Sequence, residues 1–160
     1  MGTSWRCFPR SPVAEGRHLT RRPIEPAPLL AAVSDPGLGG AALFLGTVRR
    51  GAEDGPVASI EYSAYEEMVE SEFDRILAEA GQRWPGGRVA VCHRLGTVPA
   101  GEASIAIAAA MPHRADAFAA CRFVIEAAKQ RLPVWKQEIL DDGTRRWRGD
   151  PHPGARSPQE

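Results

Sequence analysis

The chain has 160 residues, which suits one domain with its own hydrophobic core and is short for two. Twenty basic residues balance twenty acidic ones and 43% of the residues are hydrophobic, a composition typical of soluble globular proteins and unlike that of basic nucleic-acid-binding domains. No apolar run reaches the roughly 18–20 residues that a membrane-spanning helix needs, and the N-terminal region lacks the apolar segment of a secretory signal. We therefore expect a cytoplasmic protein that binds neither nucleic acid nor membranes.

The first half of the chain predicts a flexible extension followed by strands and helices. Residues 1–17 lack periodicity and are rich in Pro, Gly and Arg, which favours an extension that precedes a domain over residues 18–148. The domain is expected to begin with a short strand, a short helix, an apolar strand, an alternating strand and an amphipathic helix, at His18–Arg22, Ala27–Ser34, Ala41–Val48, Val57–Tyr65 and Glu66–Trp84. The apolar stripe of the long helix is formed by Val69, Phe73, Ile76, Leu77 and Ala80.

The second half predicts more strands and a second main helix. Two strands, a helix, a strand and a return strand are expected at Arg88–Leu95, Ala103–Met111, Ala117–Arg131, Val134–Leu140 and Thr144–Arg148. Asp116 is a plausible N-cap of that helix, whose buried stripe would be Phe118, Cys121, Val124, Ile125 and Ala128. Residues 149–160 are expected to be disordered. Two main helices among mostly adjacent, antiparallel strands predict an α+β domain.

The three cysteines give no sign of a metal site or a disulfide framework. Cys7, Cys92 and Cys121 are far apart, and the sequence contains neither a CxxC motif nor a Cys/His cluster at zinc spacing. We expect free thiols in a reducing compartment and no bound metal.

Lysine is rare in this chain. Eighteen of the twenty basic residues are arginine, and the two lysines, Lys129 and Lys136, lie seven residues apart. Arginine stays protonated in protein sites, whereas lysine can lose its proton when it is buried or close to another cation. The pattern favours a pair of amines that takes part in chemistry, with Glu138 on the same strand face as Lys136. The alternatives are a cation that complements the helix dipole for Lys129 and a solvated strand residue for Lys136.

The start of the second main helix is a candidate anion site. His113 and Arg114 precede the helix, whose first N–H groups and partial positive charge attract anions. Arg49 follows an apolar strand and could act as another anion ligand. These residues favour a phosphate pocket assembled from both ends of the chain, and an unliganded surface pair at His113 and Arg114 is the equal alternative.

Five ordered segments together resemble the large, catalytic subunit of molybdopterin synthase, the MoaE family. In chain order they are GTVRR, EYSAYEEM, HRLGTVPAGE, PHRADAFAACRF and KQRLPVWKQE, at residues 46–50, 61–68, 93–102, 112–123 and 129–138. The likeness runs from about Leu19 to Trp147. Met111 departs from it, because a small polar residue is expected there. The short tail also shows no clear counterpart of an arginine that the family's C-terminal region lends to a neighbouring subunit.

The resemblance implies an α/β-hammerhead fold and a homodimer within a heterotetramer. It also implies a small ubiquitin-like partner whose C-terminal Gly-Gly tail carries a thiocarboxylate. The implied sulfurtransferase reaction moves sulfur from that tail to cyclic pyranopterin monophosphate and builds the dithiolene of molybdopterin, with no metal or other cofactor in this subunit. The resemblance assigns catalysis to Lys129 and Lys136. It assigns substrate contacts to Thr47, Val48, Arg49, His113, Arg114, Gln137 and Glu138.

Two other functions are compatible with parts of the sequence. A non-catalytic binding module of the same fold would dock the ubiquitin-like partner, but it would not need the two lysines or the His113–Arg114 pair. A phosphoryl-recognising hydrolase would use the anion pocket, but the sequence offers no convincing nucleophile–base pair. The sequence therefore favours the sulfurtransferase.

Overall fold

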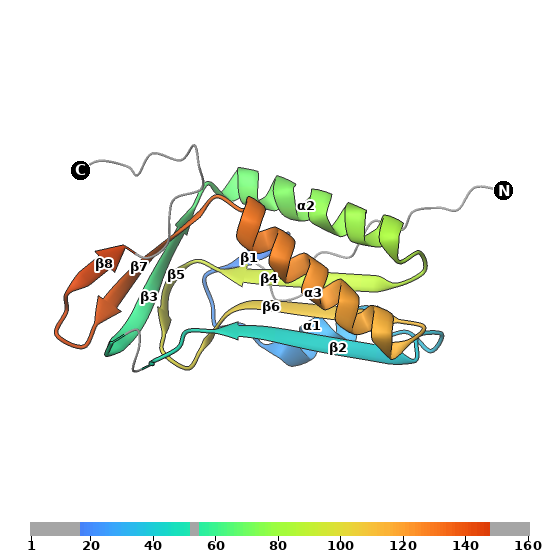
Figure 1. The fold of residues 1–160 in the computed structure, drawn as a ribbon, viewed down its shortest axis with the longest axis horizontal. Helices are drawn as coiled ribbons and strands as arrows, with labels where there is room; N and C mark the ends of the chain where they lie inside the picture. Colours follow the sequence, from blue (N-terminus) through green and yellow to red (C-terminus); the bar gives the residue numbers. More distant parts are fainter. Residues whose placement is uncertain (1–16, 52–54, 148–160) are drawn as a thin grey trace.

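A computed structural model describes residues 17–51 and 55–147, which form an α+β fold of eight strands and three helices. The strands form two four-stranded sheets that lie side by side (Figure 1). Residues 1–16 of the expected extension and the expected tail at 149–160 lie outside the described residues. Arg17 was expected in the extension, but its backbone N–H donates to Glu70 and its guanidinium pairs with Asp74 at 2.8 Å.

The first sheet has the strand order β1-β4-β6-β2. Its short first strand pairs parallel to β4, and the other pairs are antiparallel. The bounds are β1 Leu19–Thr20, β2 Gly40–Thr47, β4 Arg88–Arg94 and β6 Ala103–Met111. The second strand thus forms one edge of this sheet among the described residues.

The second sheet has the strand order β5-β3-β7-β8 and is antiparallel throughout. Its strands are β3 Val57–Ala64, β5 Gly96–Pro99, β7 Val134–Leu140 and β8 Arg145–Trp147. The sequence reasoning did not foresee β5. Only Leu95 separates β4 from β5, and Gly96 has φ +82°, a backbone conformation that glycine adopts readily, so the chain turns there from the first sheet into the second.

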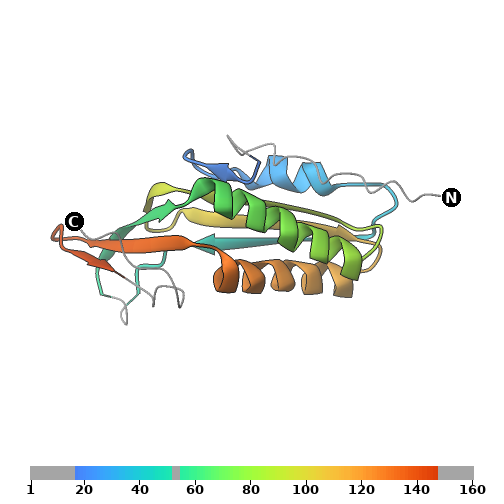
Figure 2. The same ribbon diagram turned by 90° about the horizontal axis from the view of Figure 1, so that it is seen from above.

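The helices cover both faces of the first sheet. The short α1, Pro26–Val33, packs on β4 and β6, while α3, Arg114–Arg131, packs on β6 and β2 from the opposite face (Figure 2). The long α2, Glu66–Arg83, packs against α3 and β4. The core lies between α2, α3 and the sheet, and it includes all five side chains of the predicted α2 stripe.

The predicted buried stripe of α3 was wrong at Phe118, whose side chain is 67% exposed. The buried residues are mostly small, which lets the helix approach the sheet: Ala117, Ala120, Cys121, Val124, Ala127 and Ala128. Phe118 follows Ala117 and therefore lies about 100° further round the helix, outside the contact with the sheet.

The predicted N-cap of α3 was also wrong. The helix begins at Arg114, so its N-cap is His113, and Asp116 lies in the first turn, where a carboxylate favours the helix dipole. Gly40 at the start of β2 allows this first turn to lie close, because a Cβ there would come within 2.9 Å of the Arg114 Cα. The first turn of α3 thus packs directly on the first residue of β2.

Candidate functional site

The predicted site residues fall into two groups at opposite ends of α3. His113 and Arg114 lie at its N-terminal end, and Lys129 lies in its last turn. Fifteen residues separate Arg114 from Lys129, which corresponds to about 22 Å along the helix. Within one copy of the chain, the structure therefore does not bring the His113–Arg114 pair to the lysines.

Ion pairs to α2 fix the C-terminal end of α3, where the chain continues into β7. Arg131, the last residue of α3, bonds to Glu72 and Glu79 of α2, with N–O distances of 2.6 Å and 3.0 Å. Only Leu132 and Pro133 separate α3 from β7. Lys129 is exposed on one side of this connection, and Lys136 is exposed on the other.

Alternation along β7 separates the residues around Lys136 into two faces. Lys136 and Glu138 share one face, which we call the inner face of the second sheet, as the sequence predicted. Gln137 points to the outer face, where its side-chain oxygen accepts a hydrogen bond from Arg145 at 3.0 Å. The predicted substrate contact by Gln137 therefore lies on the side of the strand away from Lys136.

Tyr62 and His93 lie beside Lys136 on the inner face. Tyr62 of β3 is directly opposite Lys136 of β7 in the ladder, so their side chains are neighbours. The Tyr62 ring meets the His93 ring edge-on, with 5.4 Å between centroids. Both side chains are buried. The first and second sheets therefore meet next to Lys136. Tyr62 and His93, the two residues at this junction, belong to the segments EYSAYEEM and HRLGTVPAGE.

Burial keeps the His93 ring neutral. Its Nδ1 donates a hydrogen bond to the Arg94 carbonyl at 2.9 Å, because a carbonyl can only accept. Burial, with a smaller contribution from the positive charge of Lys136, lowers the pKa of His93 to about 4. Burial also raises the pKa of Tyr62. The wall beside Lys136 is therefore uncharged at neutral pH.

Thr47 ends β2 and is followed by Val48 and Arg49, at the same end of the molecule as the lysines. Val48 is buried, its backbone N–H bonds to the Glu102 carbonyl at 2.9 Å, and its own carbonyl accepts from Gly101 at 2.8 Å. Thr47 and Arg49 are exposed on either side of it. Val48 is thus a core residue that fixes the direction of its two neighbours.

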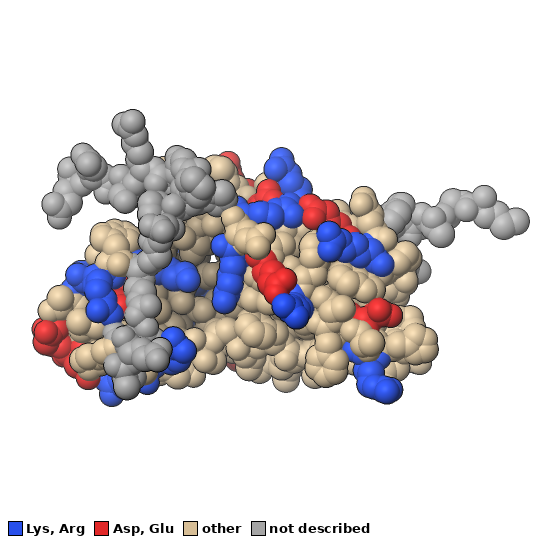
Figure 3. Space-filling model, viewed as in Figure 1, with Lys and Arg blue, Asp and Glu red and all other residues tan. Residues whose placement is uncertain are grey.

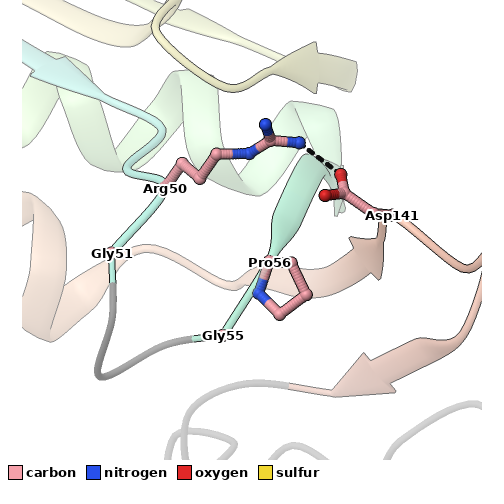
Figure 4. Close-up of a pocket in the computed structure, with 5 residues that line it drawn as sticks. All are labelled: Arg50, Gly51, Gly55, Pro56 and Asp141. Carbon is pink, nitrogen blue, oxygen red and sulfur yellow. Dashed lines mark hydrogen bonds and ion pairs between the residues drawn. The ribbon is translucent and has the colours of Figure 1, made fainter.

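A shallow surface pocket of about 440 Å³ lies next to this segment. It is lined by Arg50, Gly51, Gly55, Pro56 and Asp141, and none of these was predicted as a site residue (Figure 4). Arg50 forms an ion pair with Asp141 across the pocket, and its Nε donates to the Val57 carbonyl at 3.3 Å. The pocket therefore joins the segment after β2 to the turn between β7 and β8, and its polar groups bind each other.

Basic side chains gather near the lysine end. Figure 3 shows them on both sides of the recess between the lobe of β3, β7 and β8 and the C-terminal end of α3. In residues 17–51 and 55–147, no group of His, Cys, Asp or Glu is arranged to hold a metal ion. In the same ranges, no helix is long and apolar enough to cross a membrane.

The comparisons with known proteins agree on one family. A family model described as MoaE protein matches residues 19–131. The molybdopterin synthase catalytic subunit of Thermoplasma volcanium is 37% identical over 129 residues, which cover 81% of this chain and 94% of that protein. The bovine (Bos taurus) molybdopterin synthase catalytic subunit is 42% identical over 116 residues, covering 72% of this chain.

The relatives differ in length. The matched region spans 61% of the bovine protein and 33% of the relative from Drosophila pseudoobscura. Among solved structures, the crystal structure of molybdopterin synthase from Staphylococcus aureus matches with a TM-score of 0.79 at 30% identity, covering 83% of this chain and 96% of that one. The fold described above therefore has a close experimental counterpart.

Proposed function

Because the chain belongs to the MoaE family, we propose that it is the catalytic subunit of a molybdopterin synthase. Its substrate is cyclic pyranopterin monophosphate, and its sulfur donor is the C-terminal thiocarboxylate of a small ubiquitin-like partner. The observation that carries the proposal is the position of the two lysines. Lys129 and Lys136 flank the junction between α3 and β7, and Lys136 stands on the inner face beside an uncharged wall.

The lysines supply chemistry that arginine could not. In the proposed reaction the thiocarboxylate sulfur attacks a carbon of the pterin side chain, so that a carbon–sulfur bond forms while the tail stays attached as a thioester. A lysine ammonium holds the incoming anion and donates a proton to the oxygen that leaves. Water then attacks the acyl carbon of the thioester while a lysine amine in its neutral form accepts the proton of the water. The acyl–sulfur bond breaks, the tail leaves as a carboxylate, and the sulfur stays on the pterin as a thiolate.

We further propose that each active site is completed by a second copy of the chain. The His113–Arg114 pair lies about 22 Å from Lys129 along α3, which is too far to share one small substrate within a copy. The exposed strand β2 supports self-association, because it forms a sheet edge among the described residues and carries Leu43 and Leu45, each 39% exposed. A homodimer that binds two small partners would then contain two complete sites.

Reconstitution tests the catalytic proposal. The chain is incubated with the pterin substrate and a ubiquitin-like partner that carries a C-terminal thiocarboxylate, and dithiolene formation is followed. Product that depends on both lysines supports the proposal. Stable binding of the partner without any product would identify the chain as a binding module.

Mixed dimers test the shared site. One copy carries Arg114→Ala and the other carries Lys136→Ala, so each is impaired alone. In the mixed dimer one of the two sites regains both wild-type residues, and we expect up to half of the wild-type activity. No recovery, in dimers shown to have exchanged subunits, would contradict a site built from two copies.

A further inference from the structure

The inner face of the second sheet carries a second cation near Lys136 that the motifs do not point to. Arg146 of β8 is directly opposite Glu138 of β7 in the antiparallel ladder, so their side chains lie on the same face. Glu138 is two residues from Lys136 and shares its face. Lys136, Glu138 and Arg146 therefore form one row of charges across two neighbouring strands.

Glu138 holds Arg146 in place. The residue Glu138 is only 4% exposed, and a buried carboxylate is costly unless it is paired. One of its oxygens, Oε2, accepts hydrogen bonds from Arg146 Nε at 2.9 Å and from Arg146 Nη2 at 2.5 Å. These two bonds orient the guanidinium plane, since both come from one edge of the group.

Arg146 nonetheless reaches the surface. Its side chain is 46% exposed, while that of Glu138 is 5% exposed. The ion pair thus buries the negative charge and presents the positive one. An anion approaching Lys136 from solvent would meet the guanidinium of Arg146 rather than the carboxylate of Glu138.

We propose that Arg146 is a further substrate-binding residue, which Glu138 orients so that it holds an oxyanion of the reactants beside Lys136. This inference rests on the proposed function. The oxyanion belongs either to the phosphate of the pterin or to the terminal thiocarboxylate of the partner's tail, and the N–H donors of arginine suit both anions. Glu138 then acts as a positioning residue rather than as a substrate ligand.

The neighbouring residue in β8 provides a matched control. Arg145 lies on the outer face of the same strand, where its Nη1 bonds to Glu61 at 2.9 Å and to Gln137 at 3.0 Å. Its side chain is 55% exposed, similar to that of Arg146. Arg145→Ala therefore removes the same charge from the same strand, but from the face away from Lys136, and its ion pair with Glu61 is more exposed than that of Arg146 with Glu138.

Steady-state kinetics of the reconstituted complex test the proposal. We expect Arg146→Ala to raise the KM of one reactant about 10- to 100-fold, the range for loss of a hydrogen bond to a charged group, with a smaller change in kcat. A raised KM for the pterin identifies the phosphate as the bound anion, and a raised KM for the partner identifies its tail. Arg146→Lys should recover part of the loss, and Arg145→Ala should stay within about twofold of wild type.

Glu138→Gln tests the positioning role. It keeps the shape of the side chain but removes the charge that orients Arg146. The KM that Arg146→Ala raises should therefore rise in this variant too. Combined with Arg146→Ala, it should add little further increase, because both changes remove the same contact. Thermal melting of each variant confirms that the fold is retained before kinetics are compared.

A binding experiment separates this inference from the proposed function. Inorganic phosphate is titrated into the full chain, and phosphate binding is followed by its stabilising effect on thermal melting. Wild type and Arg145→Ala should be stabilised by phosphate more than Arg146→Ala. Unchanged KM values in an active complex of the Arg146→Ala variant would overturn the inference. If wild type is inactive, the proposed function fails, and equal phosphate stabilisation in all three proteins would then refute the role of Arg146.

Discussion

Acidification should destabilise this protein through His93. The ring belongs to β4, is buried and meets the Tyr62 ring edge-on. Its pKa is lowered from 6.5 to about 4, chiefly because burial disfavours the charged form. The unfolded chain therefore binds a proton at His93 at a higher pH than the folded chain does. Between these two pKa values the unfolded state holds more protons, so stability rises with pH and is lost as the pH falls from about 6.5 towards 4.

The magnitude follows from the size of the shift. A pKa lowered from 6.5 to about 4 corresponds to at most about 3 kcal/mol. Between pH 7 and about pH 4.5, the difference in proton binding at this single ring amounts to about 2 kcal/mol of lost unfolding free energy. This is a large part of the stability of an ordinary domain.

Urea denaturation at a series of pH values measures the effect. His93→Asn is the reference protein, because its amide can still donate to the Arg94 carbonyl but does not titrate. The carboxylates of both proteins titrate alike, so the difference between the two pH profiles reports His93 alone. Parallel profiles between pH 7 and about pH 4.5 would refute the argument that burial keeps this ring neutral beside Lys136.

Further predictions concern the site and the core. Lys129→Arg and Lys136→Arg should each keep the fold and partner binding but lose most turnover, and near-normal dithiolene formation in both would mean that positive charge alone suffices. Arg49→Ala and Arg114→Ala should weaken substrate binding by about 1.5–3 kcal/mol, measured by calorimetry, and unchanged affinity in both would remove them from the site. Phe73→Ala empties a fully buried position of α2 and should cost about 3–5 kcal/mol in chemical denaturation; a cost below about 1 kcal/mol would contradict the assigned core.

Periodicity in the sequence was sufficient for the main elements of the fold. The α2 stripe and the order of the longer strands could be predicted because each repeats one pattern over many residues. The strand β5 could not, because Gly96 and Pro99 at its ends read as turn residues and only pairing with β3 makes the segment a strand. The first turn of α3 was also missed at Arg114, and it packs on Gly40 of β2, a contact between distant parts of the sequence.

The sequence could supply the candidate site residues but not their arrangement in space. Alternation correctly placed Lys136 and Glu138 on one face, and it also implied that Gln137 points away. Two facts needed the structure: the register between β7 and β8, which brings Arg146 to Glu138, and the direction of α3, which separates His113 from Lys129. Both depend on how elements pair in space, which a linear pattern does not contain.

The length of α3 has a consequence for how this protein can vary. The helix is the rigid spacer between the two groups of candidate site residues, so its eighteen residues set the distance between the ends that two copies would align in the proposed shared site. Inserting one residue would turn one end by about 100° relative to the other and shift it by about 1.5 Å, while an insertion of two full turns would keep the orientation but lengthen the spacer by about 10 Å. Surface turns such as the one between α2 and β4 are free of this constraint. Insertions and deletions are therefore expected to be tolerated in those turns and excluded from α3, even where the altered helix would fold equally well.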